Sequence, residues 1–378
     1  MKKLGKILLH LLPIFLLIVG IGVISYFGHQ WWQESELQRE RPKVVKAKDG
    51  TNINASWHTF SAYQKGLRDK YSFINKTSVY VPPRTWDGKD FIIPGLVSTK
   101  SYNFANKKYD TSDSMTPQGL AVVNKYILIT AYDGEHKHAS VIYVLNKKTG
   151  KYLKTIQVKG RSHLGGIAYD PVAKNIWVTE SIGDDPALMS FSLKDLKKYN
   201  PKKYLPIEYD HKIVIPTIEN ASTVTYYDNQ LFVGFFNMYD RGKVASYRIT
   251  RGGKHNGSIT NNEIKSVTGS VRWTNADGEA SMDKQIQGIA IYQDRIFLSQ
   301  SYGSNDSKLY VFPTSALNSL DEKNAEKIID MPPYLEQITA YKGQLLCLFE
   351  SGAKLYAKPQ IVIMDRILSL NINALFGV

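Results

Sequence analysis

From about Asp90 onward, short apolar runs alternate with turn residues, and one phrase returns several times. Residues 116–133 read TPQGLAVVNKYILITAYD, which is an apolar run led by glycine, a short polar break and a second apolar run. The same arrangement recurs in HLGGIAYDPVAKNIWVTES (163–181) and IQGIAIYQDRIFLSQSYG (286–303). Apolar runs of this length, joined by short polar turns, predict pairs of antiparallel strands.

Five such units can be counted. Their first runs are GLAVV, GIAYD, TVTYY, GIAIY and QITAY, beginning at Gly119, Gly166, Thr223, Gly288 and Gln337. The second runs are YILITA, NIWVTE, LFVGFF, RIFLSQ and LLCLFE, and the third are SVIYVLN, LMSFSL, KVASYRI, KLYVFP and QIVIMD. Fourth runs are visible as YLKTIQV, HKIVIP, IKSVTG and EKIIDM. The intervals of 47, 57, 65 and 49 residues lie near or above the period of a four-stranded blade. The pattern predicts an all-β protein whose residues 90–378 form a five-bladed β-propeller.

Two details of the repeat bear on how the ring is built. The run FIIPGLV (91–97) precedes the first unit without a partner, while the last unit shows three clear strands. Pairing the two would close the ring and remove exposed edges. A sixth blade hidden in residues 42–110 is the alternative. Gly119, Gly166 and Gly288 are expected to let the inner strands approach closely around the axis.

The N-terminal pattern is different. Residues 1–6 form a short basic head, and residues 7–27 carry no charged side chain if His10 is neutral, a length that spans a bilayer. Trp31 and Trp32 follow at the place of an interfacial aromatic belt. A cleaved signal peptide is the competing interpretation, but no small-x-small cleavage site follows the apolar stretch. We therefore expect an uncleaved single-pass anchor.

Residues 28–89 are predicted to be a juxtamembrane stalk and a pre-propeller segment. The part from 33 to 50 is charged and poor in apolar residues, which is typical of a helical or disordered stalk. FSAYQKGLRDKYSFI (60–74) is compatible with one amphipathic helix.

The net charge of the chain and its predicted cellular location limit the classes of partner that it can bind. The chain has a formal net charge of +14, which suits nucleic acid, an anionic membrane or an anionic wall polymer. Lys2, Lys3 and Lys6 predict a cytoplasmic N-terminus, with the propeller outside the cell membrane. This placement disfavours nucleic acid as a partner. The single cysteine, Cys347, lies in the apolar run QLLCLFES, which predicts a buried, inert thiol and excludes internal disulfides.

Propeller connectivity assigns each loop to one of two faces. The first-to-second and third-to-fourth turns share a basic face, and the other loops share an acidic face. The basic face is predicted to contact an anionic membrane or wall polymer, and simple solvation of its lysines is the alternative. The lysines concerned are Lys147, Lys148, Lys151, Lys194, Lys197, Lys198, Lys202 and Lys203.

The acidic face is where the loops of a propeller surround the mouth of the central channel. The residues that precede the inner strands or end the second strands are predicted to ring this mouth and bind a ligand. They are Gln118, Tyr132, His163, Glu180, Ser222, Asn237, Gln287, Ser301, Glu336 and Glu350. Polar lining of a water-filled channel is the alternative interpretation.

Two metal sites are predicted from the same assignment of loops to the acidic face. Glu180, Asn237 and Glu350 offer the oxygen ligands that calcium prefers. His136 and His138, with nearby acids and His163, could hold zinc or another transition metal, although histidines on a loop are weakly oriented. No cofactor is required by any motif, and calcium is the ion we expect if one binds.

No nucleophile elbow, Walker loop, H-E-x-x-H or Cys–His arrangement is present. The blade phrases resemble those of extracytoplasmic bacterial propellers of the YncE-like and gluconolactonase-like type. The stretch PQGLAVVNKYILITAYDGEHKHASVIYVLNKKTGKYLKTIQV also resembles a blade of plant-type glutamine cyclotransferases, which are five-bladed. The gluconolactonase-like resemblance implies a calcium site in the channel, for which only Glu180 and Asn237 are suitably placed.

These resemblances are specific for fold and not for activity. The function we expect is a membrane-anchored, extracytoplasmic propeller that binds a ligand or an envelope protein at its acidic mouth. The alternative is an enzyme working in the same mouth, either a calcium-dependent lactonase-like hydrolase or a glutamine-cyclotransferase-like enzyme. The sequence predicts neither the ligand nor the oligomeric state.

Overall fold

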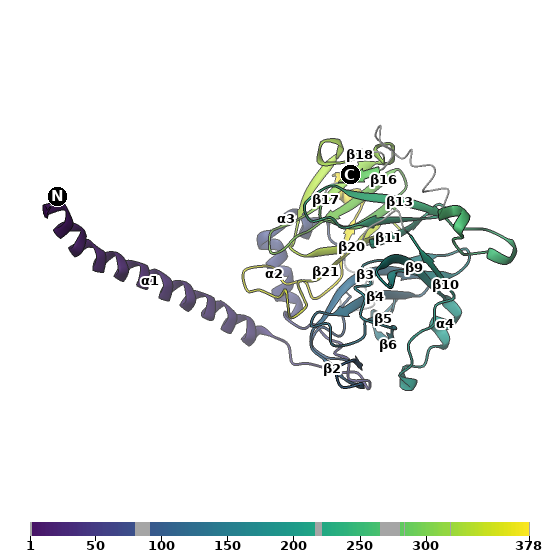
Figure 1. The fold of residues 1–378 in the computed structure, drawn as a ribbon, viewed down its shortest axis with the longest axis horizontal. Coiled ribbons are helices and arrows are strands. Elements are labelled where there is room, and N and C mark those ends of the chain that lie inside the picture. The colour runs from purple at the N-terminus through teal and green to yellow at the C-terminus, as the bar shows by residue number, and fades with distance from the viewer. Residues whose placement is uncertain are drawn as a thin grey trace.

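Five antiparallel sheets follow one another along the chain as the blades of a β-propeller (Figure 1). The computed structural model describes residues 2–79, 91–215, 221–264, 280–282, 284–317 and 319–377. Within each blade the strands pair in chain order from the inner strand outward. The prediction of an all-β, five-bladed fold is confirmed, because the described part of residues 42–110 contributes helices and part of a hairpin (99–112) rather than a sixth blade.

The strand bounds define the blades. Blade 1 consists of β3 (Met115–Val123), β4 (Tyr126–Asp133), β5 (Val141–Asn146) and β6 (Tyr152–Gln157). Blade 2 consists of β7 (Ile167–Asp170), β8 (Asn175–Ile182), β9 (Asp185–Ser192) and β10 (His211–Val214). Blade 3 consists of β11 (Ala221–Tyr227), β12 (Gln230–Phe235), β13 (Gly242–Arg248) and β14 (Ala280–Met282). Blade 4 consists of β15 (Ile286–Tyr292), β16 (Arg295–Gln300), β17 (Ser307–Pro313) and β19 (Lys327–Met331). Blade 5 consists of β20 (Leu335–Tyr341), β21 (Gln344–Phe349) and β22 (Leu368–Asn371).

Short strands and helices lie outside the regular four-stranded pattern of the blades. Strand β18 (Ser319–Leu320) adds to blade 3 in parallel with β14, and β1 (Thr99–Asn103) pairs with β2 (Lys108–Ser112) before blade 1. Short helices outside the N-terminal region include α4 (Leu193–Lys198), η1 (Pro201–Lys203), η2 (Gly253–His255), η3 (Thr314–Ala316), η4 (Glu322–Asn324) and η5 (Asn373–Phe376).

The ring closes as the unpaired run at 91–97 predicts. Ile92 forms an antiparallel bridge with Arg366, and the amide of Ile367 donates to the carbonyl of Phe91 at 2.9 Å. Farther along β22, the amide of Val79 donates to the carbonyl of Ser369 at 2.8 Å. The N-terminal segment therefore covers the outer edge of blade 5 and satisfies backbone groups that an open sheet would expose.

Two strand predictions need correction. The run QIVIMD (360–365) is not the third strand of blade 5, since that strand is β22. Val362 and Met364 instead pack into the blade 5 core, and Asp365 accepts backbone hydrogen bonds. The run IKSVTG lies outside the described residues except for Ile264, and β14 serves as the fourth strand of blade 3.

The predicted single helix over 60–74 is two helices, α2 (Phe60–Lys70) and α3 (Ser72–Thr77). Tyr71 separates them with a non-helical backbone (φ −130°, ψ 60°), and its hydroxyl donates to Asp306 at 2.5 Å. This contact with the loop between β16 and β17 favours a break over a continuous helix.

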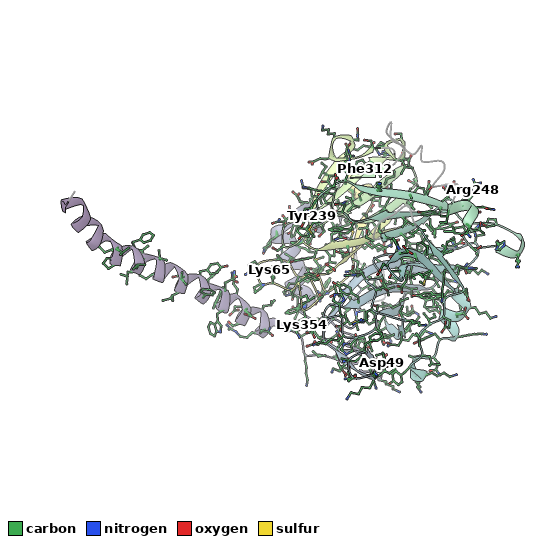
Figure 2. The ribbon with its side chains drawn as sticks, in the orientation of Figure 1. Asp49, Lys65, Tyr239, Arg248, Phe312 and Lys354 are labelled. Atoms are coloured by element: carbon green, nitrogen blue, oxygen red, sulfur yellow. The ribbon has the colours of Figure 1, made fainter. Side chains whose placement is uncertain are left out.

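Helix α1 (Lys2–Glu40) is the N-terminal apolar element. It is long and apolar enough to cross a membrane, and by length and composition it is either an anchor or a signal sequence. Its large apolar side chains from Leu12 to Trp32 stand clear of the propeller (Figure 2). The helix runs past the apolar stretch into the charged region as far as Glu40.

Asp365 and Arg366 join the segment after α1 to blade 5. One carboxylate oxygen of Asp365 accepts from the amides of Ser56 and Trp57, each at 2.8 Å. Arg366 pairs with Asp365 at 2.9 Å and donates to the carbonyl of His58 at 2.7 Å. Because both charged side chains are buried, removing either one would leave an uncompensated charge.

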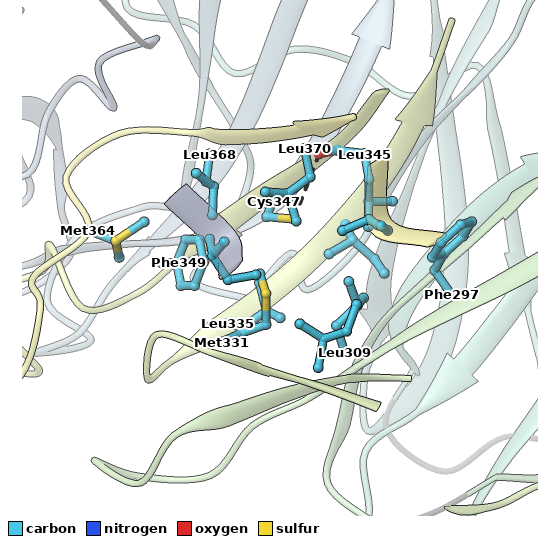
Figure 3. Close-up of a cluster of buried hydrophobic side chains, with 14 of the residues drawn as sticks. Phe297, Leu309, Met331, Leu335, Leu345, Cys347, Phe349, Met364, Leu368 and Leu370 are labelled. Carbon is cyan, nitrogen blue, oxygen red and sulfur yellow. Dashed lines mark hydrogen bonds between the residues drawn. The ribbon is translucent and has the colours of Figure 1, made fainter. Parts of the chain in front are cut away.

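The core between blades 4 and 5 shows why α2 and α3 stay attached. Leu309, Met331, Leu345 and Phe349 are fully buried there, together with Cys347 (Figure 3). The helices contribute buried side chains to the same cluster, which are Tyr63, Leu67 and Ile74. Burial raises the pKa of the Cys347 thiol, so the prediction of an inert buried cysteine is confirmed.

The inner strands crowd one another where the glycines lie. A Cβ on Gly166 would stand 2.4 Å from the amide nitrogen of Val224 in the next blade. A Cβ on Gly288 would stand 2.9 Å from the amide nitrogen of Ile338. Both obstacles are backbone atoms, so the expected role of these glycines in close strand approach is confirmed.

Gln337 occupies the position in blade 5 that glycine holds in three other blades. Its Oε1 accepts from the amides of Leu120 and Ile167, each at 3.0 Å. Its Nε2 donates to the carbonyls of Ile167 and Val224, each at 2.9 Å. One buried carboxamide therefore joins β20 to the inner strands of blades 1, 2 and 3.

We predict that Gly166→Ala lowers the free energy of unfolding by about 2–3 kcal/mol, because a backbone atom cannot move aside for the methyl group. Chemical unfolding of the full chain in detergent, followed by tryptophan fluorescence, measures the change. The matched control is Gly66→Ala in α2, where the added Cβ would meet Val362 at an ordinary 3.4 Å. This control should be neutral or stabilising by up to about 1 kcal/mol. Equal effects of the two substitutions would refute the crowding argument.

Candidate functional site

A cavity of about 810 Å³ opens at the acidic mouth of the propeller. Among the residues predicted to ring the mouth, all but Asn237 line it: Gln118, Tyr132, His163, Glu180, Ser222, Gln287, Ser301, Glu336 and Glu350. Asn237 lies in the loop after β12, where its Oδ1 accepts from the amides of Tyr239 and Asp240 at 3.0 and 2.8 Å. The structure therefore brings the other side chains to one cavity, and their binding role remains a prediction.

Irregularities in the inner strands aim several of these side chains. The pairing register shifts between Pro117 and Leu120 in β3 and between Ala221 and Thr223 in β11. Equivalent shifts occur at the start of β15 and β20. A β-bulge turns a residue away from the regular alternation of the strand. The residues released in this way include Gln118, Ser222, Gln287 and Glu336.

Glu336 and Glu350 form a hydrogen-bonded carboxyl pair at the inner end of the cavity. Their exposed fractions are 4% and 9%. Burial and the neighbouring carboxylate raise the pKa of Glu336 well above its ordinary value, and burial raises the pKa of Glu350 to about 8. The Nε2 of Gln118 donates to Glu350, which assigns the shared proton to Glu336. At neutral pH the pair therefore holds at least one proton.

Tyrosines form the wall beside this pair. The hydroxyls of Tyr132 and Tyr356 lie 3.4 Å apart, and the rings of Tyr334 and Tyr356 have centroids 4.9 Å apart. Burial and the charge of Glu350 raise the pKa of Tyr356 to about 12 and that of Tyr132 further. The phenols of Tyr132 and Tyr356 are therefore neutral at physiological pH, and the tyrosine wall offers ring faces and hydroxyl groups to a ligand.

Glu180 provides a third carboxyl group on the opposite side of the ring, at the end of β8. The hydroxyl of Tyr209 donates to its Oε1 at 3.1 Å, and burial raises its pKa. Asp184, in the loop that follows, adds an exposed carboxylate to the lining. No lysine or arginine stands among the described residues that line the cavity.

The histidines of the mouth separate into two groups. His136 and His163 lie at the rim with Tyr132, with a ring-centroid distance of 4.1 Å between Tyr132 and His163. Partial burial and the imidazole of His136 lower the pKa of His163. His138 is buried elsewhere, between Asp133 at 2.9 Å and Asp110 at 2.6 Å, where it holds the β1–β2 hairpin against blade 1.

This arrangement does not assemble the predicted metal ligands. Within the described residues, no group of three or more His, Cys, Asp or Glu side chains is placed to hold a metal ion. The calcium set of Glu180, Asn237 and Glu350 is divided because Asn237 caps its own loop. The histidine set is divided because His138 turns away from His136 to its two aspartates.

The structure adds lining residues that the sequence patterns did not identify, notably Tyr334, Tyr356 and Asp184. Tyr334 has a positive φ of 64° just before β20, and Tyr356 lies in the long loop between β21 and β22. A loop residue has no periodicity to mark its direction. For Tyr334, its position two residues before Glu336 was the available signal in the sequence that it lies near the mouth.

The predicted basic surface lies at the opposite ends of the strands. Its lysines are placed on the β5–β6 turn, on α4 and on η1, and all except Lys147 are exposed. Lys147 is half-buried and donates to the hydroxyl of Tyr341 at 2.7 Å. Contact of this surface with an anionic polymer or membrane stays a prediction.

Solved structures similar to this chain share 10–11% of its sequence. No protein-family model and no curated protein sequence matches the chain. One similar solved structure is a Kuenenia stuttgartiensis hydrazine synthase, with 10% identity, a TM-score of 0.33, and coverage of 62% of this chain and 56% of that one. A nidogen–laminin complex has 11% identity and a TM-score of 0.37, and covers 72% of this chain and 94% of that one. The Dos1 propeller has 11% identity and a TM-score of 0.33, and covers 69% and 60%.

We predict that the carboxyl pair makes the protein less stable as pH rises. Carboxyl groups with raised pKa values in the folded state hold protons that the unfolded chain releases, so their contribution is complete near pH 4.5 and declines through about pH 8. For each proton the limiting slope is about 1.4 kcal/mol per pH unit. Glu350→Gln should flatten the decline between pH 5 and 8, as measured by chemical unfolding at each pH. Glu135→Gln, an exposed carboxyl on the same face, should keep the wild-type profile. A wild-type profile in Glu350→Gln would contradict the assignment.

Proposed function

We propose that this protein is a membrane-anchored, extracytoplasmic β-propeller that binds a small ligand in its acidic mouth. The observation that carries the proposal is the cavity of about 810 Å³, into which side chains from all five blades converge. Its size is within the range of small-molecule sites, which are concave and carry a few converging polar groups. Buried carboxyl groups without a basic partner are costly, and a binding site is the usual reason to retain them.

The anchor part of the proposal is supported by α1 and its surroundings. The apolar residues from Leu12 to Phe27 make no core of their own, and Trp31 and Trp32 follow at the level of a membrane interface. The positive charges near the N-terminus favour its cytoplasmic location, which places the propeller outside.

The lysine surface supports a second partner. Gln30 in α1 meets the mouth-side loop of blade 5, where it accepts a hydrogen bond from Gln360. The lysines lie at the other face, on the α4 and η1 side of the ring. This arrangement favours an anionic wall polymer over the anchoring membrane as the contact of the lysines.

An enzyme is the second candidate, and one observation favours it. Glu336 and Glu350 share a proton within a cavity, as the carboxyl dyads of acid–base catalysts do. A group with a pKa near 8 can exchange protons at neutral pH without a metal ion. Hydrolysis of a lactone or cyclisation of an N-terminal glutamine requires this kind of proton transfer.

We predict that membrane-impermeant maleimide labels Lys197→Cys in intact spheroplasts that express the full chain. Lys3→Cys should be labelled only after lysis, because it lies on the cytoplasmic side. Cys347 is buried and adds no background. Labelling of Lys3→Cys in intact spheroplasts would refute the topology, and release of a shortened chain into the medium would identify α1 as a signal sequence.

We predict that low-molecular-weight extracts of the cell envelope raise the melting temperature of the detergent-solubilised full chain. Ser222→Trp places an indole in the cavity and should abolish the shift. Lys198→Trp, on α4 at the other face, should retain it. Mass spectrometry of the recovered compound separates binding from catalysis, since an enzyme returns it changed. A shift that persists in Ser222→Trp would refute binding in the cavity.

A further inference from the structure

In the cavity, a buried pair of carboxyl groups lies beside a wall of tyrosines, and no basic side chain of the described lining accompanies them. Glu336 and Glu350 are more than nine-tenths buried, and their hydrogen-bond partners are each other and Gln118. Tyr132 and Tyr356 stand beside them with neutral phenols. The described lining offers no lysine or arginine to balance the acids.

From this combination we infer that the cavity binds a small organic cation, an ammonium group held between the Glu336–Glu350 pair and the tyrosine wall. The inference rests on the proposed function and adds the chemical class of its ligand. An ammonium ion would supply the positive charge that the buried acids lack. The aromatic faces attract the same charge through their quadrupoles, and this attraction grows when the site is dry.

Other ligand classes fit the geometry less well. An anion would face Glu180, Asp184 and the carboxyl pair, with no basic side chain in the described lining. A hard metal ion needs several oxygen ligands around one point, and the described residues contain no such acidic or histidine group. A neutral polyol could use the hydroxyls and Gln118, but it would not stabilise the ionised form of the acids.

The inference predicts that cation binding is linked to the release of a proton. The titratable groups facing the pair are Tyr132 on β4 and Tyr356 in the β21–β22 loop, with Glu180, Asp184 and His163 farther around the cavity. The phenols of Tyr132 and Tyr356 stay neutral, so the carboxyl pair is the titrating group in direct contact with the ligand, whereas Glu180 and His163 lie farther from it. A bound cation favours the carboxylate form, so binding releases a proton and strengthens as pH rises.

The test is isothermal titration of the full chain in detergent with tetramethylammonium, choline and putrescine, each at pH 6 and pH 8. The neutral comparison is 3,3-dimethylbutanol, which has the shape of choline without the charge. We expect at least one ammonium probe to bind about tenfold more tightly at pH 8 than at pH 6. In buffers of different ionisation enthalpy it should release about one proton per bound cation.

Substitutions distinguish binding of the cation at the carboxyl pair from its nonspecific attraction to an acidic face. Glu350→Gln and Glu336→Gln should each weaken cation binding by tenfold or more and reduce its pH dependence. Glutamine resembles the protonated acid, so the fold should persist, and a melting curve checks this. Glu135→Gln removes an exposed carboxyl at the rim and should bind as the wild type does.

Three results would overturn the inference: equal affinity for dimethylbutanol and choline, affinity independent of pH, or undiminished cation binding by folded Glu350→Gln. Failure of every ammonium probe would also overturn it. The proposed function is judged separately by the envelope-extract shift and its Ser222→Trp control. An extract component that is neutral and binds in the cavity would retain the function and reject the cation.

Discussion

The approach of the inner strands around one axis is the constraint on which the rest of this structure depends. Where the blades come closest, Gly166 faces backbone atoms of β11 at distances that exclude a side chain. Thr130 shows how the approach is used, since its hydroxyl accepts from the amide of Gly119 and donates to the carbonyl of Leu164, both at 2.7 Å. Gln337 extends the same bonding across the centre. Small residues and a few hydroxyl or amide side chains thus join neighbouring sheets.

The same crowding creates the site. Inner strands that meet tightly at Gly119 and Gly288 separate toward the mouth, and bulges at their starts direct side chains inward. The resulting cavity places Glu336 and Glu350 away from water, which is unfavourable for their charged forms and explains their raised pKa values. Stability and binding therefore make opposite demands on this end of the propeller.

Blade 5 links the anchor to the site. It carries the carboxyl pair and two of the wall tyrosines, Tyr334 and Tyr356. Its outer edge is completed by residues 78–79 and 91–93, and its mouth loop is held by Trp57, whose indole donates to the carbonyl of Gly352 at 2.8 Å. The segment that follows the apolar helix is consequently part of the support of the cavity rather than a free stalk.

The sequence patterns did not identify Gln337 or Tyr356 as residues of the centre or the site. Gln337 is a polar residue in a column that otherwise holds Gly119, Gly166, Thr223 and Gly288, and that exception in the repeat was the available signal for a central role. Tyr356 gave no signal, since it lies in a loop whose path is set by Asp365 and the N-terminal segment. The predicted calcium and zinc ligands are divided because a loop position does not determine where a side chain points, as Asn237 and His138 demonstrate.

The sequence by itself determined the repeat of short strands and favoured five blades over six, and it predicted the closure of the ring by residues 91–97, the burial of Cys347 and the face on which each loop emerges. These properties follow from the repeat and from the alternation of strands, which act over short distances along the chain. Only the tertiary structure decided the shared proton of Glu336 and Glu350, the tyrosine wall and the central position of Gln337. Each of these depends on contacts between residues far apart in the sequence, and on bulges that shift a side chain by one position.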